Sequence, residues 1–84
     1  MNISISLHDG PADGEFLTLH ADSPPNQLRV APIEPDGSDK VEVALYSLLH
    51  VEELPVSLRM FAAAYEYQGT KPSAWSLVDF SVVR

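Results

Sequence analysis

Apolar and polar residues alternate along most of this chain, as they do on strands that bury one face. Residues 2–7 read Asn-Ile-Ser-Ile-Ser-Leu, so the three aliphatic side chains fall on one side and the two serines on the other. Residues 15–19 alternate again after a turn and are expected to pair back on the first strand. The start of the chain therefore predicts a β-hairpin.

Further strands follow the same alternation. A loop is expected at 21–26, because Pro24 and Pro25 cannot donate to a strand ladder. A turn is expected at 69–73, so that the last two strands form a hairpin. The remaining strands are predicted at 27–31, at 41–46 with an extension through Leu48 and Leu49, at 61–68, and at 74–83, where both faces are partly apolar.

One stretch in the second half supports two interpretations. Leu54, Leu58 and Phe61 recur at helical spacing. From Phe61 to Tyr67, however, every second residue is apolar, which is strand spacing. Because Tyr-Glu-Tyr then runs into Gln-Gly-Thr, a strand is predicted from Phe61 onward, with a short helical turn near 55–60.

Five or six short strands separated by turn signals predict an all-β fold, either a small antiparallel sandwich or a barrel-like sheet. Long runs of helix-forming residues are missing from the sequence. The length of 84 residues suits one domain spanning 1–84. The connector at 32–40, which carries two prolines and Asp36-Gly37, is expected to be the most mobile part.

The segment His-Asp-Gly-Pro-Ala-Asp-Gly at 8–14 predicts a structural turn built on Gly10, Pro11, Asp13 and Gly14. The two glycines are expected to hold backbone conformations that residues with a Cβ atom resist. Replacing Gly14 by valine is therefore predicted to destabilise the protein by about 1 kcal/mol or more. Gly69 is expected to begin the later turn at 69–73.

Charge and composition narrow the classes of function. The net charge is −7, from twelve carboxylates against five Lys and Arg. That balance disfavours direct binding to nucleic acid or to an anionic membrane. The absence of cysteine excludes disulfides, thiolate metal sites and thiol catalysis. No signal peptide or membrane-spanning apolar run is visible.

No residue pattern in the sequence predicts catalysis. His8, His20 and His50 stand at strand ends or in loops, and no nucleophile elbow or phosphate-binding glycine loop accompanies them. The acidic residues around the turn at 8–14 lack the spacing of an EF-hand, and turn formation explains them without an ion. A chain this short rarely encloses a pocket of a few hundred Å³. We therefore predict a non-enzyme without cofactor or metal.

Two groups of residues are candidates for contact with another protein. Trp75 and Phe80 are expected in the core, whereas Tyr65 or Tyr67 is expected to remain available as a contact residue. Acidic clusters could imitate the phosphates of a nucleic acid and occupy a basic groove on a partner. The acidic candidates are Asp36 and Asp39, beside Glu42, and Glu52 and Glu53.

Two motifs resemble those of a known group of proteins. Asp9-Gly10-Pro11-Ala12-Asp13-Gly14 is similar to a Gly-Gly-Pro-x-Asp-Gly opening, with Asp9 in place of the first glycine. Residues 65–69, Tyr-Glu-Tyr-Gln-Gly, resemble a Tyr-x-Tyr-x-Gly ending. Both occur in small proteins encoded by actinobacteria and their bacteriophages. The resemblance implies a phage or prophage origin and no assigned enzyme activity.

Three hypotheses about function follow. The first is a virion accessory protein, such as a minor capsid, decoration or head–tail component, whose strand edges are covered by further copies or by a shell protein. The second is a small acidic inhibitor of a host or defence protein that binds nucleic acid. A small-molecule binder or minimal enzyme ranks third. The expected location is the virion or the host cytoplasm, with protein partners only.

Overall fold

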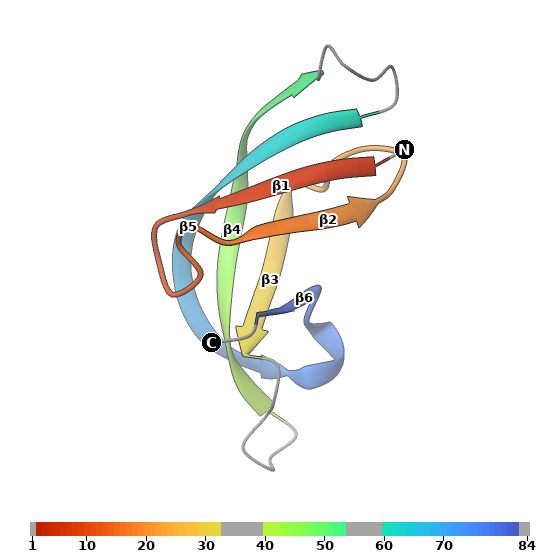
Figure 1. Ribbon diagram of the computed structural model, residues 1–84. Helices are drawn as coiled ribbons and strands as arrows, with labels where there is room; N and C mark the ends of the chain where they lie inside the picture. Colours follow the sequence, from red (N-terminus) through yellow and green to blue (C-terminus); the bar gives the residue numbers. More distant parts are fainter. Residues whose placement is uncertain (1, 33–39, 54–59, 83–84) are drawn as a thin grey trace.

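The computed structural model describes residues 2–32, 40–53 and 60–82, which form a single curved sheet of six strands (Figure 1). The sheet curls into a half-barrel with the strand order β2-β1-β5-β4-β3-β6. The all-β class is confirmed, in its barrel-like form. The strands are β1 (Asn2–His8), β2 (Phe16–His20), β3 (Gln27–Pro32), β4 (Lys40–Glu53), β5 (Met60–Ala74) and β6 (Phe80–Val82).

The sheet is mixed, with both antiparallel and parallel pairings. Strand β1 pairs antiparallel with β2 but parallel with β5, and β6 pairs parallel with β3. The other two pairings, β3–β4 and β4–β5, are antiparallel. Alternation with a period of two is the same in both kinds of pairing, so the sequence pattern carries no information about strand direction.

The predicted first hairpin is confirmed. Asn2 pairs with His20 at one end of the ribbon and Ser6 pairs with Phe16 at the other. Residues 9–15 connect the two strands. The alternating aliphatic residues of β1, including Ile3 and Ile5, are fully buried inside the half-barrel, as their pattern predicts.

Strand β5 is longer than predicted, and the expected turn at 69–73 is wrong. Residues 69–73 continue the ladder with β4, in which Gly69 pairs with Leu45. The next pair skips Gln68, so the chain accommodates one extra residue as a bulge. Gly69 has a φ of 134°, a conformation open to glycine. The glycine therefore bends a continuous strand and does not end it.

The predicted last strand at 74–83 is also wrong. A 3-10 turn at Trp75–Leu77 interrupts it, and only β6 remains extended. Strand β6 crosses to the far side of the sheet and pairs with β3, so the predicted hairpin with β5 does not form. Residues 55–59 of the helical turn predicted near 55–60 lie outside the described residues, and Met60 already belongs to β5. Residues 33–39 of the predicted connector also lie outside the described residues.

Buried side chains form two clusters on opposite faces of the sheet. The larger cluster fills the inside of the half-barrel and includes Tyr46 and Tyr65, with Phe80 packed against it. The smaller cluster lies on the other face of β3 and β4, where alternate residues point the opposite way. Its buried members are Ala31, Val41 and Val43, and the half-buried Trp75 packs against them. Both predicted core aromatics thus pack against the core while remaining half-buried.

An ion pair fastens the chain end to the sheet. The backbone N–H of Arg29 donates to Oδ2 of Asp79 at 2.8 Å, and the N–H of Asp79 donates to the Arg29 carbonyl at 2.8 Å. The guanidinium adds one hydrogen bond to each carboxylate oxygen, both at 3.1 Å. These hydrogen bonds and the negative charge raise the pKa of Arg29. Asp79 therefore positions β6 beside β3.

Replacing Asp79 by alanine is expected to loosen β6. The variant loses the acceptor for both the backbone and the guanidinium of Arg29, while the three-residue β6 has little other pairing. Hydrogen exchange should accelerate in the peptide that spans 75–82. Asp22→Ala, which removes an exposed loop carboxylate, is the control. Unchanged exchange in the Asp79 variant would contradict this role.

Candidate functional site

The inside of the half-barrel holds an open cavity of about 350 Å³. Its walls are formed by strands β3, β4, β5 and β6 and by the turn between β1 and β2. Most of the lining is apolar, and the polar groups are the hydroxyl of Thr70 and the carboxylate of Glu42. The lining residues are Pro11, Ala12, Val30, Ala31, Glu42, Ala44, Thr70 and Val82.

A cavity of this size runs against the expectation that so short a chain lacks one. The half-barrel creates it because β2 and β6 end the sheet without pairing to each other in the described part of the chain. Glu42 is the one titratable group among the described lining residues, so the cavity offers no acid–base pair. Such a lining suits the binding of an apolar group.

The turn at 9–14 is held from beneath by the buried phenol of Tyr46. Its hydroxyl donates to the carbonyl of Asp9 at 2.8 Å and accepts the backbone N–H of Ala12 at 2.9 Å. Asp13 closes the turn from within, since its Oδ1 accepts the N–H of Asp9 at 2.7 Å. These hydrogen bonds place Pro11 and Ala12 at the wall of the cavity.

Three residues of this turn adopt left-handed backbone conformations. The φ angles are 67° at Asp9, 70° at Gly10 and 83° at Gly14. A Cβ atom on Gly10 would lie 2.4 Å from Cγ of Tyr67, whereas one on Gly14 would meet nothing within 4 Å. Gly10 is therefore required by both its backbone and its packing, and Gly14 by its backbone alone.

Tyr65 has no exposed surface, contrary to the expectation that it could remain available for contact with a partner. It pairs with Leu7 of β1, and its side chain is fully buried inside the half-barrel. Its hydroxyl donates to the carbonyl of Pro25 at 2.6 Å. The tyrosine thus fastens the loop at 21–26 to the core.

Burial of Tyr65 predicts a loss of stability in alkali. Desolvation raises the pKa of Tyr65 to about 12 from an ordinary value of 10.0. Between these pH values the unfolded chain releases the phenol proton and the folded chain retains it, so the free energy of unfolding falls as pH rises from 10 to 12. Denaturant unfolding at several pH values should show that Tyr65→Phe has a shallower decline. If the free energy of unfolding of Tyr65→Phe fell as steeply with pH as that of the original chain, Tyr65 would not be the cause of the decline.

Tyr67 is half-buried and supports the turn. Its ring centroid lies 5.6 Å from that of Tyr46, and its ring covers Gly10. Its hydroxyl pairs with that of Thr70, which lines the cavity. The part of Tyr67 that remains exposed is thus next to the turn and the cavity.

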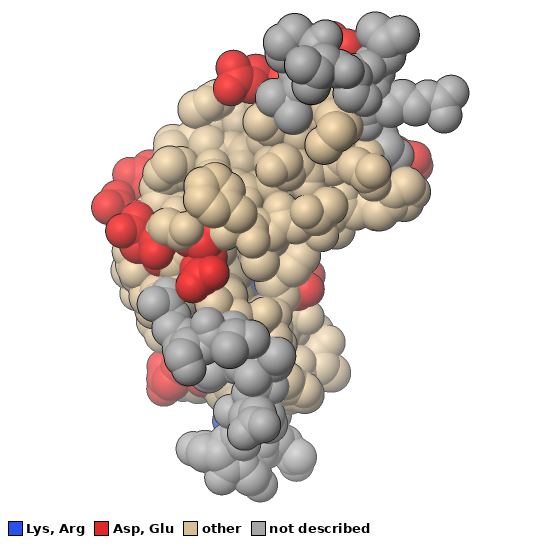
Figure 2. Space-filling view, viewed as in Figure 1, with Lys and Arg blue, Asp and Glu red and all other residues tan. Residues whose placement is uncertain are grey.

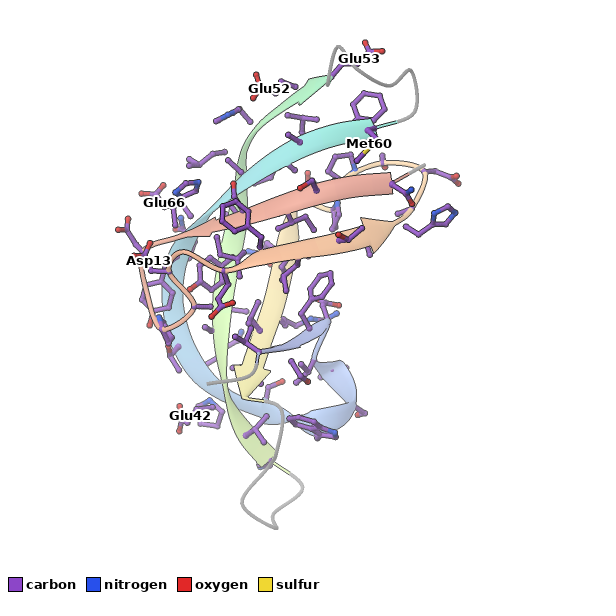
Figure 3. All side chains as sticks on the ribbon, viewed as in Figure 1. Asp13, Glu42, Glu52, Glu53, Met60 and Glu66 are labelled. Atoms are coloured by element: carbon purple, nitrogen blue, oxygen red, sulfur yellow. The ribbon has the colours of Figure 1, made fainter. Side chains whose placement is uncertain are left out.

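The acidic candidates do not gather into one patch in the described structure. Glu52 and Glu53 are exposed at the end of β4, while Glu42 lies near its opposite end (Figure 3). Asp36 and Asp39 lie outside the described residues. Figure 2 shows most of the visible carboxylates along the left side of the molecule, with single red groups also beside the hollow and at the right edge.

The histidines offer one nucleophile–base pair, between Oγ of Ser6 and Nε2 of His8 at 3.2 Å. The pair is exposed and lies away from the cavity lining. No carboxylate of the described residues forms an ion pair with His8, so a third catalytic member is missing there. His20 binds Oδ1 of Asn2 through Nδ1 at 2.9 Å. Within 2–32, 40–53 and 60–82, no three His, Asp or Glu side chains gather as metal ligands.

The sequence did not predict the hydrogen bonds of the Tyr46 hydroxyl to the turn, the Arg29–Asp79 ion pair or the cavity. A buried tyrosine needs a partner for its hydroxyl, and a turn rich in glycine has unpaired backbone groups, so those two facts could have suggested the Tyr46 contact. Nothing in the local pattern around Asp79 indicates its partner, which lies 50 residues away.

Comparisons with protein-family models, with curated proteins and with solved structures find no match to this chain. The resemblance to the actinobacterial and phage proteins therefore stays a prediction. Among the described residues, no helix has the length and apolar character required to span a bilayer.

Proposed function

We propose that this chain is a non-catalytic structural or interaction protein encoded by a phage or prophage, and that it serves as an accessory component of the virion. The proposal rests on the two open edges of the sheet. Strands β2 and β6 each have one neighbour in the described structure, so each leaves an edge for another chain. An open apolar cavity lies inside the same half-barrel. Both features suit a protein that is completed by its partner.

The turn at 9–14 supports the phage origin. The resembling proteins have two glycines where this chain has Asp9 and Gly10, and both of these positions are left-handed here. A backbone of this kind explains a preference for glycine at both positions. The motif is thus a structural element that presents Pro11 and Ala12 to the cavity, and it carries no catalytic group.

A second candidate is the acidic inhibitor. It is favoured by the exposure of Glu52 and Glu53 at one end of β4, where a basic partner could approach without displacing the core. Replacement of both residues by glutamine should then slow association with that partner markedly and reduce its dependence on salt. An unchanged association rate would exclude these residues from the contact.

Fractionation of a lysate tests the choice between the two. After induction of the strain that carries the gene, particles are separated on a density gradient and washed with salt, and the protein is followed by mass spectrometry. A virion component should co-migrate with the particles and survive the wash. Recovery in the soluble fraction alone would overturn the virion proposal and favour the inhibitor.

A further inference from the structure

The outer edge of β2 carries backbone groups that no other described strand pairs with. Leu7 donates its N–H to the carbonyl of Glu15, so this pair lies at a hydrogen-bonded position of the ribbon. Bonded and non-bonded pairs alternate along antiparallel strands. In the register that pairs Ser4 with Thr18, the backbone groups of Phe16, Thr18 and His20 therefore point away from β1. No described strand pairs with them.

This edge lacks the features that usually prevent pairing with another chain. Strand β2 reads Phe-Leu-Thr-Leu-His and contains no proline, lysine or carboxylate. Phe16 is 75% exposed, more than any other large hydrophobic residue of the described chain. The other sheet edge differs, because β6 has only three residues and is preceded by the charged Asp79.

We infer that β2 pairs antiparallel with β2 of a second copy of this chain, about a two-fold axis at Thr18. In this register Thr18 faces its own equivalent, and Phe16 faces His20 of the second copy. These three residues are those whose backbone groups point outward, so the pairs that they form across the axis are hydrogen-bonded and alternate with non-hydrogen-bonded Leu17–Leu19 pairs. Two sheets then join into one continuous sheet across the dimer.

Side chains and charges fit the same register. Leu17, half-buried on the inner face, comes opposite Leu19 of the second copy, which extends the apolar interior across the junction. Glu15 comes opposite Ala21, so no carboxylates face each other along the paired segment. For a chain with a net charge of −7, an uncharged strand is the edge where two copies repel each other least.

The inference deepens the proposed function by naming the partner of one edge, and its test is independent of the particle. Sedimentation velocity of the purified chain should show a dimer whose fraction rises with concentration. Thr18→Lys, which places two ammonium groups opposite each other at the axis, should raise the dissociation constant about tenfold or more. Ser4→Lys places a charge on the same face, one strand away from the edge, and should leave the dissociation constant nearly unchanged.

A cross-link tests the axis directly, because the chain contains no cysteine. Hydrogen-bonded antiparallel partners have Cα atoms about 5.5 Å apart, within the range of a disulfide. Thr18→Cys should therefore form a covalent dimer on mild oxidation, while Ser4→Cys should not. A monomer at all concentrations, or a dimer that neither Thr18 variant affects, would overturn the inference. Neither result would bear on whether the protein is found in particles.

Discussion

Replacing Gly10 by alanine should cause the largest loss of stability of any single change considered, about 2–4 kcal/mol in the free energy of unfolding. Two effects add at this position. The backbone is left-handed, with a φ of 70°, and a Cβ atom would lie 2.4 Å from Cγ of Tyr67. The clash is with the root of the ring, which cannot move without leaving Tyr46 and Thr70. Denaturant unfolding measures the loss.

Gly14→Ala is the matched control for this prediction. Gly14 has a similar φ of 83°, but a Cβ atom there has no neighbour within 4 Å. Only the backbone strain applies, so we expect a loss of about 1 kcal/mol. If the two alanine variants were equally stable, the close packing of Tyr67 on Gly10 would be wrong.

Tyr46→Phe should be the second most damaging change, at about 2–3 kcal/mol. The phenylalanine keeps the buried ring but removes the hydroxyl that bonds Asp9 and Ala12. The Ala12 N–H then loses its partner at a buried position and the Asp9 carbonyl at a part-buried one, and the cost of an unsatisfied buried group is about 1–3 kcal/mol. Hydrogen exchange at the Ala12 amide should accelerate more than the global loss of stability accounts for.

Tyr67→Phe provides the comparison for that variant. It also removes one tyrosine hydroxyl, but this hydroxyl is exposed and bonds only the side chain of Thr70 among the contacts described. We expect a loss below about 1 kcal/mol and no change in exchange at Ala12. A larger effect from Tyr67 than from Tyr46 would show that the turn is held by the outer ring and not by the buried hydroxyl.

The elements that the sequence predicts well are those in which one face of a strand is buried. Strand β1 is the clearest case, because each residue that alternation assigns to the core, from Ile3 to Leu7, is buried. The first hairpin follows as well, since its turn lies between two such runs. These features depend on neighbours in the sequence, which is the information that a periodic pattern contains.

The parts that could not be predicted depend on contacts between distant residues. Gly69 looks like a turn residue, yet it lies within the 15-residue strand β5. This strand stays paired with the 14-residue β4 on both sides of Gly69, because a bulge accommodates one extra residue. The end of the chain reads as one strand, but Asp79 bonds Arg29 and directs β6 to the opposite side of the sheet. Neither partner is visible in the local pattern.

The candidate site was harder to predict than the fold for the same reason. The cavity requires the turn at 9–14 to stand over strands β3–β6, and its position is set by a hydroxyl 34 and 37 residues away in sequence. Tyr65 and Tyr67 are two residues apart and point to the same face, but only the first is fully buried, because β1 and the loop at 21–26 cover it. Burial of this kind follows from the curvature of the sheet.

The most direct test of the proposed virion role is the number of copies of this chain in each purified particle. Isotope-labelled reference peptides for the chain and for the main shell protein give this ratio by mass spectrometry. A virion component predicts a constant ratio across independent preparations. Absence from the particles, or a ratio that varies with the extent of washing, would contradict the proposal.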